Sequence, residues 1–300
     1  MLKIAWSETY KYALPEGHRF PMVKYELLPE QLLYEGTVCE DAFFNPTPLS
    51  DEFILWTHTQ EYIDKLNDQL LSPKEIRNIG FPMTSQLVKR GKHIANGTYQ
   101  CSLFAMEYGI SMNIAGGTHH SFADRGEGFC VFNDVAIATN ILLQKFPTFR
   151  ILIVDLDVHQ GNGTAKIFEH QSRVFTFSMH GERNYPTRKE KSSYDIGLPD
   201  GCNDAYYLKT LMYELPRIIQ EFEPHFIFYL SGVDVLQTDK LGRLGLTKQG
   251  CKARDKFVIE IAKINQVPIA ITMAGGYSEK LSDIIDAHAN TFRLAQEVFF

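Results

Sequence analysis

The chain has 300 residues, of which 44% are hydrophobic, and a formal net charge of −6. This length and composition suit a globular protein with a large core, and we expect one domain over residues 1–300. The acidic charge argues against a general nucleic-acid binder. Five scattered cysteines without a CxxC pair predict reduced thiols in a cytoplasmic protein. No signal peptide and no membrane span are predicted, because no apolar run approaches about 20 residues.

Short apolar runs alternate with longer helical patterns along the chain. Helices are predicted at 84–107, 131–146, 203–222, 247–264 and 279–297. Strands are predicted at Leu2–Trp6, Ser111–Ala115, Ile151–Val158, Val174–Met179, His225–Leu230 and Pro268–Met273. This alternation predicts an α/β fold, with helices on both faces of a mostly parallel sheet. The polar stretch 181–202 is predicted as a long connection, either functional or a solvated excursion.

The most informative segment is ILIVDLDVH, residues 151–159. Its polar residues Asp155, Asp157 and His159 are two positions apart, so in an extended strand all three would share one face. A buried parallel strand is normally apolar throughout. Carboxylates placed there need a compensating charge, and a bound cation is the usual one. The segment therefore predicts a metal site.

Other predicted strands also end in polar or glycine-rich segments. These segments are Gly116–His120, Ser178–His180, Ser231–Asp234 and Ala274–Tyr277. Ligands of parallel sheets bind beyond the carboxyl ends of the strands, so these residues are expected at one edge. Asp157, His159 and Asp234 then form a three-ligand site with an open position, as in catalytic zinc sites. A histidine pair and a tyrosine beside such a site would equip it to hydrolyse an amide.

Five motifs resemble those of the zinc-dependent histone deacetylase superfamily. They are GGTHHS at 116–121, GFCVFND at 128–134, VDLDVHQGNG at 154–163, SGVD at 231–234 and AGGY at 274–277. The chain is most similar to the class IV branch and its bacterial relatives. The resemblance implies the arginase/deacetylase fold, a three-layer α/β/α arrangement around a mostly parallel sheet of about eight strands.

The resemblance also implies a role for each matching residue. Asp157, His159 and Asp234 would bind Zn²⁺, and Fe²⁺ suits the same ligands. His120 would be the general base and then the acid for the leaving amine, with His119 in support. Asp155 and Asn162 would orient the pair, and Tyr277 would stabilise the acyl oxygen. Arg19 would line the acyl-release cavity, and the substrate tunnel would be lined by Gly128, Phe129, Tyr185, Leu241, Gly275 and Gly276. A bound K⁺ or Na⁺ would be held by Asp155, Asp157, His159, Ser178 and Met179.

These expectations describe a monomeric enzyme that removes acetyl or longer fatty acyl groups from the ε-amine of lysine in proteins and is inhibited by hydroxamates. An acetylpolyamine amidohydrolase is the alternative. A non-catalytic acyl-lysine binding module is disfavoured because no site residue is missing. A two-manganese ureohydrolase is disfavoured because Gly161 and Leu236 occupy the positions where it needs further aspartates.

Overall fold

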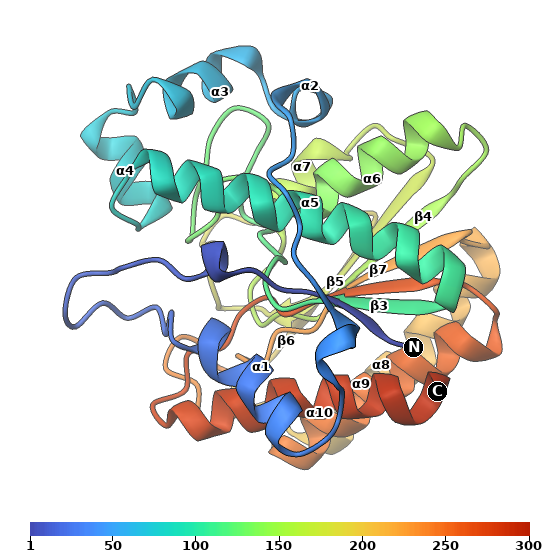
Figure 1. Ribbon diagram of the computed structural model, residues 1–300. Coiled ribbons are helices and arrows are strands. Elements are labelled where there is room, and N and C mark those ends of the chain that lie inside the picture. Colours follow the sequence, from blue (N-terminus) through green and yellow to red (C-terminus); the bar gives the residue numbers. More distant parts are fainter.

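A computed structural model describes residues 1–300 (Figure 1). Its centre is one sheet of eight parallel strands in the order β2-β1-β3-β8-β7-β4-β5-β6. The strands are β1 (Lys3–Ala5), β2 (Phe43–Phe44), β3 (Ile110–Asn113), β4 (Ile151–Asp155), β5 (Val174–Gly181), β6 (Tyr194–Leu198), β7 (Phe226–Leu230) and β8 (Ile269–Thr272). The predicted α/β fold with a parallel sheet is confirmed.

Helices cover both faces of this sheet. Figure 1 shows α1, α8, α9 and α10 on one side and α5, α6 and α7 on the other. The α-helices are α1 (Lys24–Tyr34), α2 (Asp51–Ile54), α3 (Gln60–Asn67), α4 (Pro73–Ile79), α5 (Ser85–Tyr108), α6 (Asp134–Lys145), α7 (Asn162–Ile167), α8 (Asp204–Phe222), α9 (Lys248–Ile264) and α10 (Leu281–Phe299). Two short 3₁₀ helices span Glu8–Tyr10 and Glu40–Ala42. No helix is both long and apolar enough to cross a membrane.

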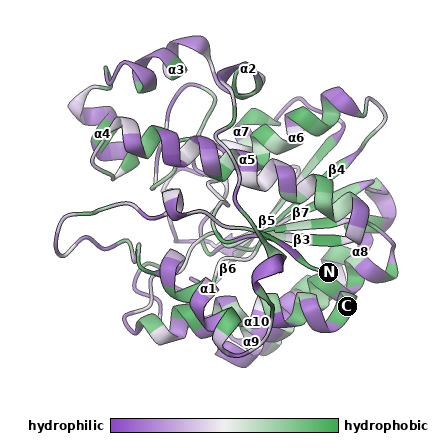
Figure 2. Cartoon of the chain, in the orientation of Figure 1, coloured by the Kyte–Doolittle hydropathy of each residue, from purple (hydrophilic) through white to green (hydrophobic).

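The sequence determines these elements through burial and capping. Every residue of β3, β4, β7 and β8 is buried, as expected for strands covered on both faces. Figure 2 shows hydrophobic residues along these strands and hydrophilic residues on the outer sides of the helices. Four of the long helices, α5, α6, α8 and α9, begin at side chains that accept a backbone N–H from the first turn. These caps are Thr84, Asn133, Asn203 and Thr247.

All six predicted strands and five predicted helices are present, with some shifted ends, but two details of the prediction are wrong. The stretch 181–202 is not only a connection, because it contains β6, which pairs with β5. The strand predicted to reach Val158 ends at Asp155. Asp157 and His159 therefore lie beyond the strand and do not share a strand face with Asp155.

Side-chain carboxylates end β4 early by binding the backbone that follows it. The amide of Asp157 donates to Asp155 Oδ1 at 3.2 Å, and the amide of His159 donates to Asp157 Oδ1 at 2.9 Å. The amide of Val158 donates to Asp234 Oδ1, beyond β7, at 3.0 Å. Because β4 and β7 are neighbours in the sheet, these bonds hold both strand ends together.

Candidate active site

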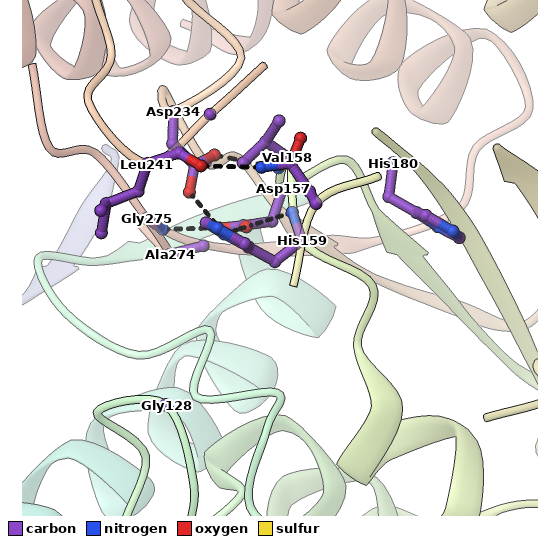
Figure 3. Close-up of polar contacts among 12 residues, drawn as sticks. Gly128, Asp157, Val158, His159, His180, Asp234, Leu241, Ala274 and Gly275 are labelled. Atoms are coloured by element: carbon purple, nitrogen blue, oxygen red, sulfur yellow. Dashed lines mark hydrogen bonds and ion pairs between the residues drawn. The ribbon is translucent and has the colours of Figure 1, made fainter. Parts of the chain in front are cut away.

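Three side chains with metal-ligating atoms meet at the ends of β4 and β7. The ligating atoms of Asp157, His159 and Asp234 lie within 4.8 Å of one another, and all three residues are buried. His159 Nδ1 is 3.0 Å from Asp157 Oδ1 and 3.3 Å from Asp234 Oδ2. Figure 3 shows the three side chains pointing toward one another, with His180 apart from them. The structure thus brings the three predicted ligands, hereafter the metal cluster, to one point.

Gly275 leaves the space that the metal cluster needs. Its amide donates to Asp157 Oδ2 at 2.8 Å. A Cβ atom at this position would lie 1.9 Å from Asp234 Oδ2 and 2.6 Å from Asp157 Oδ2. Since real Cβ contacts do not come this close, any other residue here would force the two carboxylates to move.

The electrostatics of the cluster fit a divalent cation. Asp234 Oδ2 is buried and accepts no hydrogen bond. Burial and the neighbouring Asp157 carboxylate raise the pKa of Asp234 to about 7. Two buried carboxylates this close repel each other unless a positive charge offsets them. Two carboxylate oxygens and one imidazole nitrogen are ligands that Zn²⁺ accepts, and Fe²⁺ accepts the same set.

An adjacent histidine pair lies beside the cluster, with ring centroids 4.1 Å apart. His119 Nδ1 is 2.7 Å from Asp155 Oδ2, and His120 Nδ1 is 2.7 Å from Asn162 Oδ1. Each Nδ1 therefore has an oxygen partner, which fixes the ring and leaves Nε2 for other contacts. The two partners differ in charge, because one is a carboxylate and the other a neutral amide.

This difference in charge separates the two imidazoles. Burial lowers the pKa of His119, but the Asp155 and Asp157 carboxylates outweigh it and raise the value to about 9. Burial and the positive charges of His119 and His159 hold the pKa of His120 well below its ordinary value of 6.5. At neutral pH, His120 is therefore the neutral member that can accept a proton.

Asp134 holds the loop that carries the histidine pair. Its carboxylate accepts hydrogen bonds from the Gly117 amide at 3.2 Å, the Thr118 amide at 2.8 Å and the Thr118 hydroxyl at 2.5 Å. Gly117 has a φ of 71°, and a Cβ there would lie 2.6 Å from Ala274 Cβ. Asp134 was not predicted as a site residue, although it is the last residue of the GFCVFND motif.

Two cavities meet at the metal cluster. An outer cavity of about 220 Å³ is lined by Arg19, Asn78, His120, Gly128, Phe129, His159, Tyr185, Leu241 and Tyr277. An inner cavity of about 40 Å³ is lined by Phe20, Tyr25, Arg90, Ile94, Gly116, Gly117, Thr118, His119, His120, Gly128, Phe129, Cys130, Asp157, His159, Ala274, Gly275 and Tyr277. Both linings include His120, His159 and Tyr277, so the two cavities adjoin beside the cluster.

Most predicted tunnel residues line these cavities. Phe129 and Tyr277 line both, and Tyr185 and Leu241 line the outer cavity. The Tyr185 ring stands edge-on to the His120 ring, with centroids 4.9 Å apart. The Tyr277 amide donates to Asp239 Oδ2 at 2.6 Å, while its phenol hydroxyl has no hydrogen-bond partner in the protein. This hydroxyl is free to donate to a bound molecule.

Two predicted positions need correction. Gly276 lines neither cavity, and a Cβ there would meet Val233 and His288 instead. Arg19 does not line the inner cavity, because its guanidinium lies over the Phe129 ring, 5.0 Å from the centroid, in the outer cavity. The arginine of the inner cavity is Arg90, on α5, which the motif comparison missed.

Three of the five residues predicted to bind a monovalent cation, Asp155, Ser178 and Met179, are neighbours in the sheet, while Asp157 and His159 follow the end of β4. Asp155 at the end of β4 is directly paired with Ser178 on β5, and Met179 follows Ser178. The Ser178 hydroxyl is 2.9 Å from His180 Nδ1. His180 therefore contacts Ser178 on its own strand and is not part of the metal cluster.

A second buried charged group, the Arg254–Asp255 pair on α9, lies near the cluster. Both residues are fully buried, and Arg254 Nε donates to Asp255 Oδ1 at 2.8 Å. Arg254 Nη1 donates to the carbonyl oxygens of Leu156 at 3.1 Å and Gly232 at 2.7 Å. Leu156 comes one residue before Asp157, and Gly232 comes two residues before Asp234. Arg254 therefore joins the two segments that carry the metal-cluster residues. No motif in the sequence indicates this role.

Comparisons with known proteins agree with this geometry. The family model "Histone deacetylase domain" matches residues 18–292. An uncharacterized protein of Picosynechococcus sp. is 38% identical over 99% of this chain and 99% of its own length. Histone deacetylase 2 of Arabidopsis thaliana is 26% identical over 95% of this chain and 76% of its own length.

Solved structures give the same result. The crystal structure of an HDAC homolog from Aquifex aeolicus has a TM-score of 0.83 and 26% identity, covering 98% of this chain and 84% of that chain. A structure of an HDAC homolog complexed with SAHA has a TM-score of 0.82 and 26% identity, covering 98% of this chain and 82% of that chain. The chain belongs to the histone deacetylase domain family, whose members hydrolyse amides.

Proposed function

We propose that this chain is a zinc-dependent deacylase that removes short acyl groups from the ε-amine of lysine in proteins or peptides. Residues 1–300 would act as one catalytic domain. The five cysteines are unpaired, which supports a reducing compartment such as the cytoplasm. The observation that carries the proposal is the meeting of the metal cluster, the histidine pair and the free Tyr277 hydroxyl where the two cavities join.

Asp157, His159 and Asp234 would hold the zinc ion. When bound, it lowers the pKa of water and polarises the acyl carbonyl. The raised pKa of Asp234 and its unpartnered buried oxygen support this assignment. Asp155, Asp157, His159, Ser178 and Met179 would bind K⁺ or Na⁺ beside it, largely through backbone oxygens.

The histidine pair would move the protons. His120, neutral at pH 7, accepts a proton from the attacking water and then donates one to the leaving amine nitrogen. His119, held by Asp155, contributes positive charge beside the reacting carbonyl. Asn162 orients His120 without adding a charge. The Tyr277 hydroxyl donates to the acyl oxygen as negative charge develops on it.

The outer cavity favours an acyl-lysine peptide over an acetylated polyamine. No carboxylate lines it, and the exposed guanidinium of Arg19 does. A polyamine brings further ammonium groups, which Arg19 would repel. A lysine side chain between Phe129 and Tyr185 presents mainly methylene groups to aromatic rings.

The inner cavity favours a short acyl group. Its volume is about 40 Å³, whereas a cavity that holds benzene measures about 150 Å³. Phe20, Tyr25 and Arg90 fill the space into which a longer chain would extend. We therefore expect acetyl and similarly small groups to be removed faster than octanoyl or myristoyl.

The test is hydrolysis by the zinc-loaded protein of one lysine peptide bearing acetyl, octanoyl or myristoyl, and of N-acetylputrescine. We expect the highest kcat/KM for the acetyl peptide, and a hydroxamate should inhibit it by ligating the open metal position. Faster hydrolysis of acetylputrescine would assign the enzyme to polyamines. Zinc binding without turnover of any compound would indicate a binding module.

A further inference from the structure

One buried cation lines the inner cavity and a second lies behind its aromatic wall, and neither has a carboxylate partner. Arg90 on α5 is 5% exposed and lines the cavity. Its Nε donates to the carbonyl oxygen of Tyr10 at 2.7 Å, and it has no ion pair within 4.0 Å. Its two terminal nitrogens have no hydrogen-bond partner in the protein. A buried guanidinium normally has its donors satisfied, so these free donors require a partner.

Lys24 on α1 is the second cation. It is fully buried, and its Nζ has one hydrogen bond, to the carbonyl oxygen of Ala274 at 3.3 Å. Nζ lies 5.1, 5.5 and 5.7 Å from the ring centroids of Phe20, Tyr25 and Tyr277, all of which line the inner cavity. The ammonium group is therefore separated from the cavity by a single layer of aromatic rings.

Tyr25 lies between the two cations. Its ring centroid is 5.1 Å from the Arg90 guanidinium and 5.5 Å from Lys24 Nζ. The carboxylate of Asp134, behind the histidine loop, is already bound to the hydroxyl of Thr98, to Thr118 and to the amide of Gly117. The inner end of the cavity thus carries positive charge that no local carboxylate pairs with.

We propose that Arg90 forms a carboxylate-binding subsite at the inner end of the acyl cavity, with Lys24 adding to its positive potential. The preferred substrates would be lysines bearing a short acyl group that ends in a carboxylate, such as malonyl or succinyl. This inference rests on the proposed function, because the acyl group must enter past the metal cluster. It goes further by assigning the chemistry of the acyl group.

The hydrolysis itself is unchanged. The oxygen of water bonds to the acyl carbon, the carbon–nitrogen bond breaks, and the amine nitrogen receives a proton. The terminal carboxylate takes no part in these steps and remains bound to Arg90 until the dicarboxylate product leaves. Charge-assisted hydrogen bonds to guanidinium in a buried site are strong, which gives the subsite its selectivity.

The test compares one lysine peptide bearing malonyl with the same peptide bearing isovaleryl, a neutral group with the same number of non-hydrogen atoms and the same branching. The wild-type zinc enzyme should have the higher kcat/KM for malonyl. Arg90→Gln should lower the malonyl-to-isovaleryl ratio by roughly 10–100-fold, and Arg90→Lys should restore part of it. Arg150→Gln, before β4 and paired with Glu223 at the surface, is the matched control and should leave the ratio unchanged. A wild-type preference for isovaleryl, or a ratio unaffected by Arg90→Gln, would overturn the proposal.

A binding measurement separates this inference from the proposed function. Malonate should raise the melting temperature of the zinc-loaded wild type more than that of Arg90→Gln, whereas isovalerate should affect both equally. This outcome without hydrolysis of any peptide, acetyl included, would support the anion subsite and refute the proposed deacylase. Hydrolysis of the acetyl peptide with equal malonate effects in both proteins would refute the subsite alone. If malonate binding depends on Arg90 but the enzyme does not prefer the malonyl peptide, the proposed acyl specificity is also refuted. The site would then bind only free carboxylates.

Discussion

The metal cluster and the Arg254–Asp255 pair are both buried groups of charged residues, but only in the Arg254–Asp255 pair do the positive and negative charges cancel. Asp255 accepts hydrogen bonds from Arg254, from the Tyr229 hydroxyl at 2.5 Å and from the Thr291 hydroxyl at 2.7 Å. In the metal cluster, Asp234 retains a buried oxygen with no hydrogen-bond donor. The Arg254–Asp255 pair has one positive and one negative charge, whereas in the metal cluster two carboxylates share one imidazole, so only the metal cluster needs a further cation.

The two tyrosines near these groups differ in the same way. The Tyr229 hydroxyl is bound to Asp255, while the Tyr277 hydroxyl has no protein partner and faces the cavities. The first hydroxyl contributes to stability and the second is available for chemistry. Substitutions in the two groups should therefore produce opposite patterns of lost activity and lost stability.

Removing a carboxylate from the metal cluster should have the largest effect on activity. Asp234→Asn keeps the shape of the side chain but weakens the binding of a divalent cation, so the protein should retain almost no zinc after dialysis. Activity should fall more than about 10³-fold. Zinc content by elemental analysis and kcat/KM on the acetyl peptide measure both effects. Asp286→Asn, at a surface ion pair, is the control, and full zinc content in Asp234→Asn would refute the ligand assignment.

Removing the cation from the Arg254–Asp255 pair should mainly lower the stability of the protein. Arg254→Met leaves the Asp255 charge buried and unpaired, which lowers the free energy of unfolding by about 3–5 kcal/mol. Urea denaturation of the metal-free protein measures this loss. The double variant Arg254→Met/Asp255→Leu should recover part of it, because the buried charge is gone but the hydroxyls of Tyr229 and Thr291 lose their acceptor. A single variant as stable as wild type would show that the pair is not balanced as described.

Substitution of Tyr277 should mainly lower activity, whereas substitution of Tyr229 should mainly lower stability. Tyr277→Phe should lower kcat by about 10²–10³-fold with little change in the melting temperature, because one donor to the developing oxyanion is lost. Tyr229→Phe should lower the free energy of unfolding by about 1 kcal/mol and leave kcat within a few-fold of wild type. Steady-state kinetics and urea denaturation of both variants test the pattern. Equal effects of both substitutions on kcat would remove Tyr277 from the mechanism.

The smallest effect is expected at the surface. Hydrogen bonds from Arg293 lower the pKa of Glu35 to about 2 from 4.5. A lowered carboxyl pKa stabilises the fold above pH 4.5, and this contribution is lost as the pH falls toward 2. Glu35→Gln should therefore cost roughly 0.5 kcal/mol at pH 7, after allowance for solvent screening, and almost nothing at pH 2. Urea midpoints at both pH values test this, and an equal loss at both would exclude the ion pair as its cause.

The fold was predictable because its signals are local. Continuous apolar runs mark the central strands, and helical periodicity with polar caps marks the long helices. The edge strands were missed because β2 has two residues and β6, YDIGL, is mostly not fully buried and has no apolar run. The early end of β4 was missed because Asp234, distant in sequence, binds the amide of Val158.

The candidate site was predictable where chemistry follows directly from a strand end, as at Asp157, His159 and Asp234. It was not predictable where side chains reach in from helices. Arg90 lies in the second turn of α5, and its guanidinium at the inner cavity contacts Tyr10 and Tyr25, which are distant in sequence. Arg254 gives no signal at all, since its two carbonyl partners become neighbours only in the folded sheet.

The order of residues in the metal cluster has a consequence for protein synthesis. Asp157 and His159 leave the ribosome early, but Asp234 follows much later and the Gly275 amide that steadies Asp157 later still. Strand β8, which leads to Gly275, must also insert between β3 and β7, which are made before it. In a growing chain the cluster therefore lacks a ligand until Asp234 has been made, and it lacks the amide that binds Asp157 until Gly275 has been made and β8 is in place. Zinc should therefore bind late in folding, after the central strands of the sheet have assembled.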